Sequence, residues 1–204
     1  MLRNRTTADG DIRCFVAVEI VDTKILDNFL TLGKALTTTG AILKLIKAQN
    51  IHITLRFLGN ISRNRVEEVG KLLDEVEFYP FDVELKGVGV FPNLRRVNIV
   101  WVGIEGGNVE LVNAFNQLEE KLKGIGFKSD RRGFSPHITV ARVSSGRNRD
   151  ALVEMVSDWS DREFGGFRVN AIQLKKSVLT PRGPIYSTLH EASARQRKRG
   201  SALA

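Results

Sequence analysis

Two short segments of the chain carry the same polar residues in the same order. His52-Ile53-Thr54 lies within Asn50–Leu58, and His137-Ile138-Thr139 lies within Phe134–Arg142. The sequence contains three histidines, so two of them share this setting. Histidine changes charge near neutral pH, and a pair can hold one protonated and one neutral imidazole. Such a pair suits in-line displacement at phosphorus, where a base activates the attacking hydroxyl or water and an acid protonates the leaving oxygen.

Both segments are predicted to be β-strands, because β-branched and apolar residues dominate them and no helical period fits. Side chains alternate along a strand, so each histidine points to the same side as the threonine two residues later. Thr54 and Thr139 can then donate hydrogen bonds to phosphoryl oxygens. Arg142, three residues after Thr139, can bind phosphate through two N–H groups. The other motif positions are Ile53, Leu55, Ile138 and Val140, of which the two isoleucines point to the opposite, apolar side.

The two segments belong to a longer internal repeat with an offset of 85 residues, the separation of the two histidines. Each half is predicted to contain a strand, a helix, a His-Ile-Thr strand, a second helix and a closing strand. The first helices begin at Thr23 and Asn108, which are good N-cap residue types. The remaining pairs are strands 13–20 and 98–105, helices 65–77 and 150–160, and closing strands 81–90 and 167–174. Short extra strands are expected at 43–47 and 184–191.

This order predicts an α+β fold, with α/β-type units and antiparallel-rich sheets covered by helices. Two related lobes, repeat halves 13–90 and 98–178, would face each other across a central cleft about a pseudo-two-fold axis. His52, Thr54, His137 and Thr139 would then share one cleft. Residues 1–191 are expected to form one bilobal domain, and the basic tail 192–204 is expected to be disordered.

The net charge is +8, and four of these charges lie in the tail, on Arg195, Arg197, Lys198 and Arg199, which leaves 8 − 4 = 4 for the body. A basic body fits a polyanionic partner such as RNA, although the tail could equally serve solubility alone. The single Cys14 cannot form an intrachain disulfide and is interpreted as a core residue. With no signal peptide and no membrane-spanning stretch, a monomeric, cytoplasmic protein is expected.

Other kinds of site have less support in the sequence. Two histidines with threonines lack the third and fourth ligands typical of zinc, so no metal and no cofactor are expected. Neither a phosphate-binding glycine loop nor a Gly-x-Ser-x-Gly elbow occurs. Phe15 is a candidate for stacking on a base near the cleft. His190 lacks the His-x-Thr context and is interpreted as structural or exposed.

The motifs His52-Ile-Thr-Leu55 and His137-Ile-Thr-Val140 resemble those of the 2H phosphoesterases. The similarity is greatest to the RNA 2′,3′-cyclic phosphodiesterases, also called 2′-5′ RNA ligases of the LigT and ThpR type. Further similar segments are Arg13–Val18, Leu55–Gly59, Ser135–Arg142 and Pro184–Glu191. The resemblance therefore extends over nearly the whole chain, from about Arg13 to Glu191.

The resemblance implies metal-independent hydrolysis of an RNA 2′,3′-cyclic phosphate to a 2′-phosphate end, with a reversible 2′-5′ joining activity. It implies that His52 is the acid that protonates the departing 3′ oxygen and that His137 is the base that activates water. It also implies that Thr54, Thr139 and Arg142 hold the phosphate. The role of Arg56 is left open, because the equivalent position of the second motif is Ala141.

Two alternatives remain open from the residues alone. The same pair of imidazoles could act on small cyclic nucleotides or on other 2′-5′-linked nucleotides, or could serve mainly in ligation. A non-catalytic RNA-binding module is a further alternative, although binding alone does not need a titrating pair. The physiological RNA, the oligomeric state and the purpose of the tail are not determined by these residues.

Overall fold

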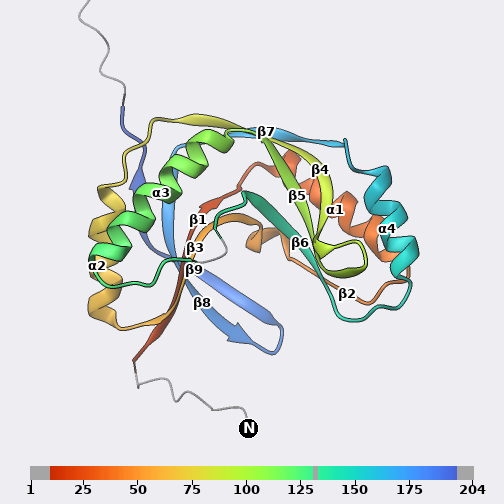
Figure 1. Cartoon of the computed structure of the whole chain (residues 1–204), viewed down its shortest axis with the longest axis horizontal. Coiled ribbons are helices and arrows are strands. Elements are labelled where there is room, and N and C mark those ends of the chain that lie inside the picture. The colour runs from red at the N-terminus through yellow and green to blue at the C-terminus, as the bar shows by residue number, and fades with distance from the viewer. Residues whose placement is uncertain (1–9, 131–132, 197–204) are drawn as a thin grey trace, which may run out of the picture.

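The computed structural model describes residues 10–130 and 133–196, which form two antiparallel sheets with helices packed on them (Figure 1). The elements follow one another as β1 (Ile12–Glu19), α1 (Thr23–Thr38), β2 (Leu43–Leu45), a 3-10 turn η1 (Ala48–Asn50), β3 (His52–Ile61), α2 (Arg63–Asp74), β4 (Phe81–Asn93), β5 (Arg96–Gly106), α3 (Asn108–Gly124), β6 (His137–Val143), α4 (Arg149–Asp158), β7 (Glu163–Val169), β8 (Ala171–Thr180) and β9 (Gly183–Ser193). The predicted α+β class is confirmed.

Each sheet has its own pair of covering helices. The first sheet has the strand order β3-β1-β8-β9 and packs against α2 and α3. The second has the order β2-β6-β5-β4-β7 and packs against α1 and α4. In Figure 1 the two helix pairs lie at opposite ends of the molecule, with the sheets between them. The strands β3 and β6, which carry the two motifs, contact each other where the sheets meet.

The repeat halves do not coincide with the two sheets. The closing strand of the first half, β4, pairs with β5 of the second half. In return, β8 near the end of the chain pairs with β1. The first helices are exchanged in the same way, since α1 packs with the second sheet and α3 with the first. The two units therefore interlock, so that each sheet combines strands from both halves.

The prediction of one closing strand at 167–174 was wrong, because two strands occupy this region. β7 ends at Val169 and joins the second sheet beside β4, whereas β8 begins at Ala171 and joins the first sheet. Both stretches are rich in apolar and β-branched residues, so their composition does not reveal the break at Asn170. One continuous run of strand-forming residues thus crosses from one sheet to the other.

Helices α1 and α3 begin at Thr23 and Asn108 as predicted, but in both the N-cap is the residue before the predicted one. The N-cap of α1 is Asp22, whose carboxylate accepts the backbone N–H of Ile25 at 3.1 Å, and Thr23 is the first helical residue. The N-cap of α3 is Gly107, with φ of 83°, in place of Asn108. Here a Cβ would lie 2.7 Å from the carbonyl oxygen of Asp82, so close packing of the chain favours glycine.

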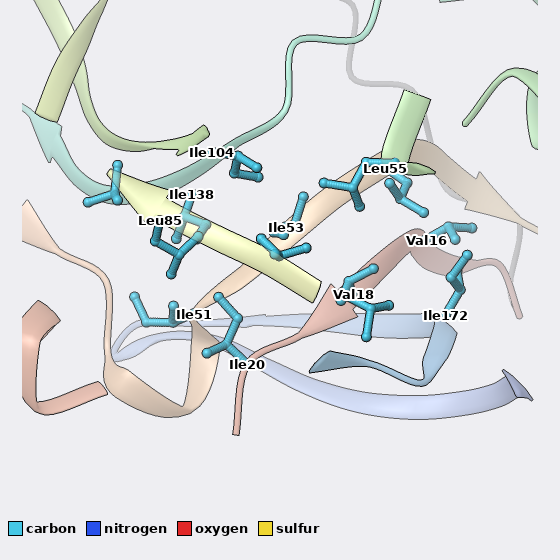
Figure 2. Close-up of a cluster of buried hydrophobic side chains, with 14 of the residues drawn as sticks. Val16, Val18, Ile20, Ile51, Ile53, Leu55, Leu85, Ile104, Ile138 and Ile172 are labelled. Atoms are coloured by element: carbon cyan, nitrogen blue, oxygen red, sulfur yellow. The ribbon is translucent and has the colours of Figure 1, made fainter. Parts of the chain in front are cut away.

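A shared hydrophobic core lies behind the motif strands. Ile53 and Ile138 are both fully buried, as the strand alternation predicts. Figure 2 shows them in one cluster with Leu85 and Ile104, side chains that come from both repeat halves. Cys14 is buried as expected, and burial raises the pKa of its thiol to about 11, so the thiol is neutral at physiological pH.

The last described residues are more ordered than the predicted tail boundary at 192 implies. Strand β9 continues to Ser193. The backbone N–H groups of Ala194 and Arg195 then donate to the carbonyl oxygens of Asn170 and Phe78, at 2.7 and 2.8 Å. The predicted disorder of residues 197–204 concerns a segment outside the described residues. Among the helices described, none has the length and apolar character needed to cross a membrane.

Candidate active site

The two motif histidines have the same backbone anchor. His52 and His137 are the first residues of β3 and β6. The Nδ1 atom of His52 lies 2.8 Å from the carbonyl oxygen of Asn50, and Nδ1 of His137 lies 2.7 Å from that of Ser135. A carbonyl can only accept, so Nδ1 must carry the hydrogen in both rings. In the neutral state each ring therefore presents Nε2 as an acceptor, and in the protonated state as a donor.

A β-bulge in each motif strand determines which later side chains join the histidines. Along β1, Ala17 pairs with Thr54 and Val16 with Arg56, so Leu55 is the extra residue. In β6 the extra residue is Val140, since Trp101 pairs with Thr139 and Val100 with Ala141. At each bulge two consecutive side chains are therefore buried. Beyond it, side chains that simple alternation would place on the buried side lie on the exposed side, and the reverse.

The consequence is that Arg142 lies on the same side as His137 and Thr139, whereas plain alternation would place it on the opposite one. Burial raises the pKa of the Tyr186 hydroxyl and the charge of Arg142 opposes this rise, so Arg142 is within electrostatic range of the ring that packs on His52. In the first motif the residue at this position is Phe57, which is 52% exposed. The repeat thus supplies a cation on one side of the site and an aromatic ring on the other.

The contacts of Arg56, whose role the motifs leave open, give this residue a structural role. Arg56 lies on the buried side of the first bulge and is 9% exposed. Its guanidinium pairs with Glu119 of α3 and donates to the carbonyl oxygen of Lys128. Asp130 lies 3.7 Å away. Arg56 therefore connects β3 with α3 and with the segment around Lys128 that precedes β6. Through these contacts it stabilises the position of the segment that leads to the second motif.

Aromatic rings surround both histidines, and most of them were not predicted. The ring of Phe15 lies 5.0 Å from that of His52, and Tyr186 lies 5.5 Å from it at nearly a right angle. On the other side, the ring of Phe91 lies 4.9 Å from His137. Tyr186 comes from β9, within the segment Pro184–Glu191 that resembles the family, and Phe91 comes from β4; neither strand carries a His-x-Thr motif, so only the tertiary fold places these rings beside the histidines.

Phe15 does not offer the exposed face that base stacking requires. It is 2% exposed, because His52, Phe57 and Tyr186 cover its ring. The structure therefore argues for a supporting role, in which Phe15 holds the imidazole of His52 in place. Exposed aromatic surface beside it belongs to Phe57 and, in part, to Tyr186.

A buried ion pair lies beside His52. Lys175 of β8 is 6% exposed and its Nζ lies 2.9 Å from a carboxylate oxygen of Glu19. Burial is the main cause that lowers the pKa of His52, from 6.5 to about 4. The positive charges of Lys175 and His137 lower this pKa further, whereas the hydrogen bond to Asn50 and the charge of Glu19 raise it. In the absence of an anion, His52 is therefore neutral at physiological pH.

The strands that carry His52 and His137 contact each other where the sheets meet. The two imidazoles are within electrostatic range, since His137 contributes to the lowered pKa of His52. The candidate site therefore comprises these two histidines with Thr54, Thr139 and Arg142, which lie on the same sides of their strands. Within residues 10–130 and 133–196, no group of three or more His, Cys, Asp or Glu side chains is arranged to hold a metal ion.

Comparisons with known proteins identify the family to which this arrangement belongs. Residues 14–193 match the family model of the AKAP7 2′5′ RNA ligase-like domain. The RNA 2′,3′-cyclic phosphodiesterase of Aeropyrum pernix is 40% identical over 80% of this chain and 93% of its own length. That of Archaeoglobus fulgidus is 38% identical, over 87% of this chain and 98% of its own length. The chain belongs to the RNA 2′,3′-cyclic phosphodiesterase family.

Solved structures of two other proteins have the same fold. E. coli LigT, crystallised with 3′-AMP, has a TM-score of 0.75 at 22% identity and covers 91% of this chain and 99% of its own. A Thermus thermophilus protein has a TM-score of 0.77 at 22% identity, over 92% of this chain and 100% of its own. At this identity the likeness shows a shared fold, in agreement with the fold that the motifs predict.

Proposed function

We propose that the protein hydrolyses the 2′,3′-cyclic phosphodiester at the 3′ end of RNA. A water molecule attacks phosphorus and transfers a proton to Nε2 of neutral His137. The P–O3′ bond breaks, and Nε2 of protonated His52 gives its proton to the departing 3′ oxygen. The products are a 2′-phosphomonoester and a free 3′ hydroxyl, and the two imidazoles have exchanged their protonation states.

One observation carries this proposal: both Nδ1 atoms are fixed to backbone carbonyls, so both Nε2 atoms are free to exchange protons at one site. Two groups poised in this way suit general acid–base catalysis, in which each contributes roughly 10²–10⁴-fold. Relatives of the chain, such as those of Aeropyrum pernix and Archaeoglobus fulgidus, are RNA 2′,3′-cyclic phosphodiesterases. A binding module would have no need of this arrangement.

The low pKa of His52 sets a condition on its role as the acid. With a pKa of about 4, the free protein holds little protonated His52 at neutral pH. A bound phosphodiester carries a negative charge, and a negative charge beside an imidazole stabilises its protonated form. Substrate binding would thus raise the pKa of His52 at the moment when a proton is needed. The acid therefore becomes charged when the substrate is in place.

Three side chains are proposed to hold the phosphoryl group. The hydroxyls of Thr54 and Thr139 face the same side as their histidines and can donate to the non-bridging oxygens. Arg142, exposed on that side, adds a positive charge and two parallel N–H donors. These groups stabilise the charge that builds up on the phosphoryl oxygens during displacement.

The same displacement joins RNA ends when the 5′ hydroxyl of a second RNA replaces water as the attacking group, which forms a 2′-5′ phosphodiester and frees the 3′ hydroxyl. The matched family model is described as 2′5′ RNA ligase-like, which supports a 2′-5′ joining activity of this kind. Small cyclic nucleotides are further candidate substrates, because the reacting ring is the same. The relative rates on these substrates would rank them.

The test is product analysis on an RNA oligomer that ends in a 2′,3′-cyclic phosphate. The wild-type protein should convert it to a 2′-phosphate end, and His52→Ala and His137→Ala should each lower kcat by at least about 10²-fold. His190→Ala is the matched control, since this third histidine bonds to Asp74 of α2 at 2.7 Å and should be dispensable for the reaction. Full activity in both motif variants would refute the mechanism.

A further inference from the structure

A cavity lies beside His52. It has a volume of about 320 Å³ and is formed by the chain around η1 on one side and by the β8–β9 hairpin on the other. That hairpin projects from the body of the molecule (Figure 1). The lining residues are Lys47, Gln49, Asn50, Thr180, Arg182, Gly183, Pro184, Ile185 and Tyr186.

The cavity is continuous with the site through two residues. Asn50 accepts the Nδ1 hydrogen of His52 through its carbonyl oxygen, and its side-chain amide donates to the carbonyl oxygen of Pro184 at 2.9 Å. Tyr186 contacts the ring of His52 with one edge and lines the cavity as well. A ligand that extends from the reacting centre past Tyr186 would therefore enter this cavity.

The charge of the cavity suits an anion. Lys47 and Arg182 lie on its two sides, both exposed, and no aspartate or glutamate is among the described residues that line it. Neither cation takes part in any ion pair found in residues 10–130 and 133–196. Both cations are therefore available for a ligand.

The hairpin turn that carries Arg182 is held in a defined shape. The hydroxyl of Thr180 donates to the carbonyl oxygen of Gly183 at 2.6 Å and accepts the backbone N–H of Arg182 at 3.2 Å. Beside the turn, Ile185 is 61% exposed, and its apolar surface can contact a base. The cavity therefore combines two cations with the apolar surface of Ile185 and the aromatic ring of Tyr186, and cations beside an aromatic ring suit single-stranded RNA.

We propose that this cavity binds the phosphate that links the terminal nucleoside to the nucleotide before it. This inference rests on the proposed function. A cyclic phosphate ends the RNA chain, so every other phosphate of the substrate lies on the 5′ side of the terminal nucleoside. Lys47 and Arg182 then distinguish RNA ends from cyclic mononucleotides, which have no such phosphate. They are specificity residues and take no part in the chemistry.

The test compares two substrates, a cyclic mononucleotide and an RNA dinucleotide that ends in a 2′,3′-cyclic phosphate. The double variant Lys47→Ala/Arg182→Ala should raise KM for the dinucleotide by about tenfold or more, since two charge-assisted contacts are lost. KM for the mononucleotide should stay unchanged, and kcat should stay unchanged for both. The slope of log KM for the dinucleotide against log salt should fall by about 0.7 for the lost phosphate contact.

A matched control removes two charges elsewhere. Lys71 of α2 and Lys123 of α3 are exposed on the helices that cover the outer face of the first sheet, and Lys71→Ala/Lys123→Ala should leave both KM values unchanged. An equal rise in KM for both substrates would overturn the proposal, because the cations would then act at the reacting phosphate. Unchanged KM for the dinucleotide would overturn it too.

Calorimetry with inert analogues separates this inference from the proposed function. A 3′-phosphorylated dinucleotide should bind the wild-type protein more tightly than the corresponding nucleoside 3′-phosphate, and Lys47→Ala/Arg182→Ala should remove the difference. If the wild-type protein hydrolyses neither substrate but keeps this difference, the proposed function fails while the phosphate site stands. Equal affinity for both analogues refutes the site whatever the activity.

Discussion

His52 should make the folded protein sensitive to acid. The pKa of its side chain is 6.5 in an unfolded chain and about 4 in the fold, chiefly because the ring is buried. Between these two values the unfolded state binds more protons, so the free energy of unfolding falls as the pH falls through this window. A difference of 6.5 − 4 = 2.5, at about 1.36 kcal/mol for each pH unit, corresponds to about 3 kcal/mol in full. Between about pH 7 and about pH 4.5 the expected loss is roughly 2 kcal/mol.

The assay is urea denaturation of the wild-type protein and of His52→Gln at these two pH values. Carboxylates that titrate in the same range contribute equally to both proteins, so the difference between their pH-dependent losses reports His52. The variant should lose about 2 kcal/mol less than the wild type. Thr54→Val, a substitution without a titrating group in the same strand, should keep the wild-type loss. Equal losses in wild type and His52→Gln would refute the argument that burial holds His52 neutral.

Three further perturbations follow from named contacts. Lys175→Met removes a buried cation that disfavours protonated His52, so the acidic limb of the kcat/KM profile should move to higher pH; an unmoved limb would contradict this electrostatic coupling. Arg56→Ala leaves Glu119 buried without its partner, and denaturation should show a loss of roughly 3 kcal/mol; a loss below about 1 kcal/mol would contradict the structural role. Gly89→Ala would drive a Cβ into the ring of Trp101, so a loss of about 1–3 kcal/mol is expected, and a neutral effect would mean that the ring moves freely.

The sequence predicts the strands and helices of this fold better than it predicts how they assemble. The hydrophobic period, which is a local signal, and the 85-residue offset find both motif strands and the four α-helices of the described residues. They do not show that β4 and β8 change places between the two sheets, since strand pairing depends on contacts far apart in the chain. The break at Asn170 has the same origin: both sheets accept apolar strands, so composition does not assign a strand to either one.

Some residues of the candidate site can be predicted from local sequence, whereas others depend on how the strands pair. His52, Thr54, His137 and Thr139 can be found from sequence, because alternation along a strand is a local rule. The side of the strand on which Arg142 lies depends on the bulge at Val140, and a bulge is detected only from the register with the neighbouring strand. Residues outside the His-x-Thr motifs also lie beside His52: Lys175 of β8 lowers its pKa and Tyr186 of β9 packs on its ring, and the assembly of the sheets brings both to the site.

The two halves of the site share a backbone plan but differ in environment, and this difference bears on the roles of the histidines. His52 lies among Phe15, Tyr186 and Lys175, in a place where a positive charge is costly until an anion arrives. The kcat/KM profile reports the free protein and the kcat profile reports the complex with substrate. If the bound phosphate supplies the compensating charge, the acidic limb of kcat should lie at higher pH than that of kcat/KM. Coincident limbs would show that the anion does not reach His52, and the assignment of His52 as the acid would lose its physical basis.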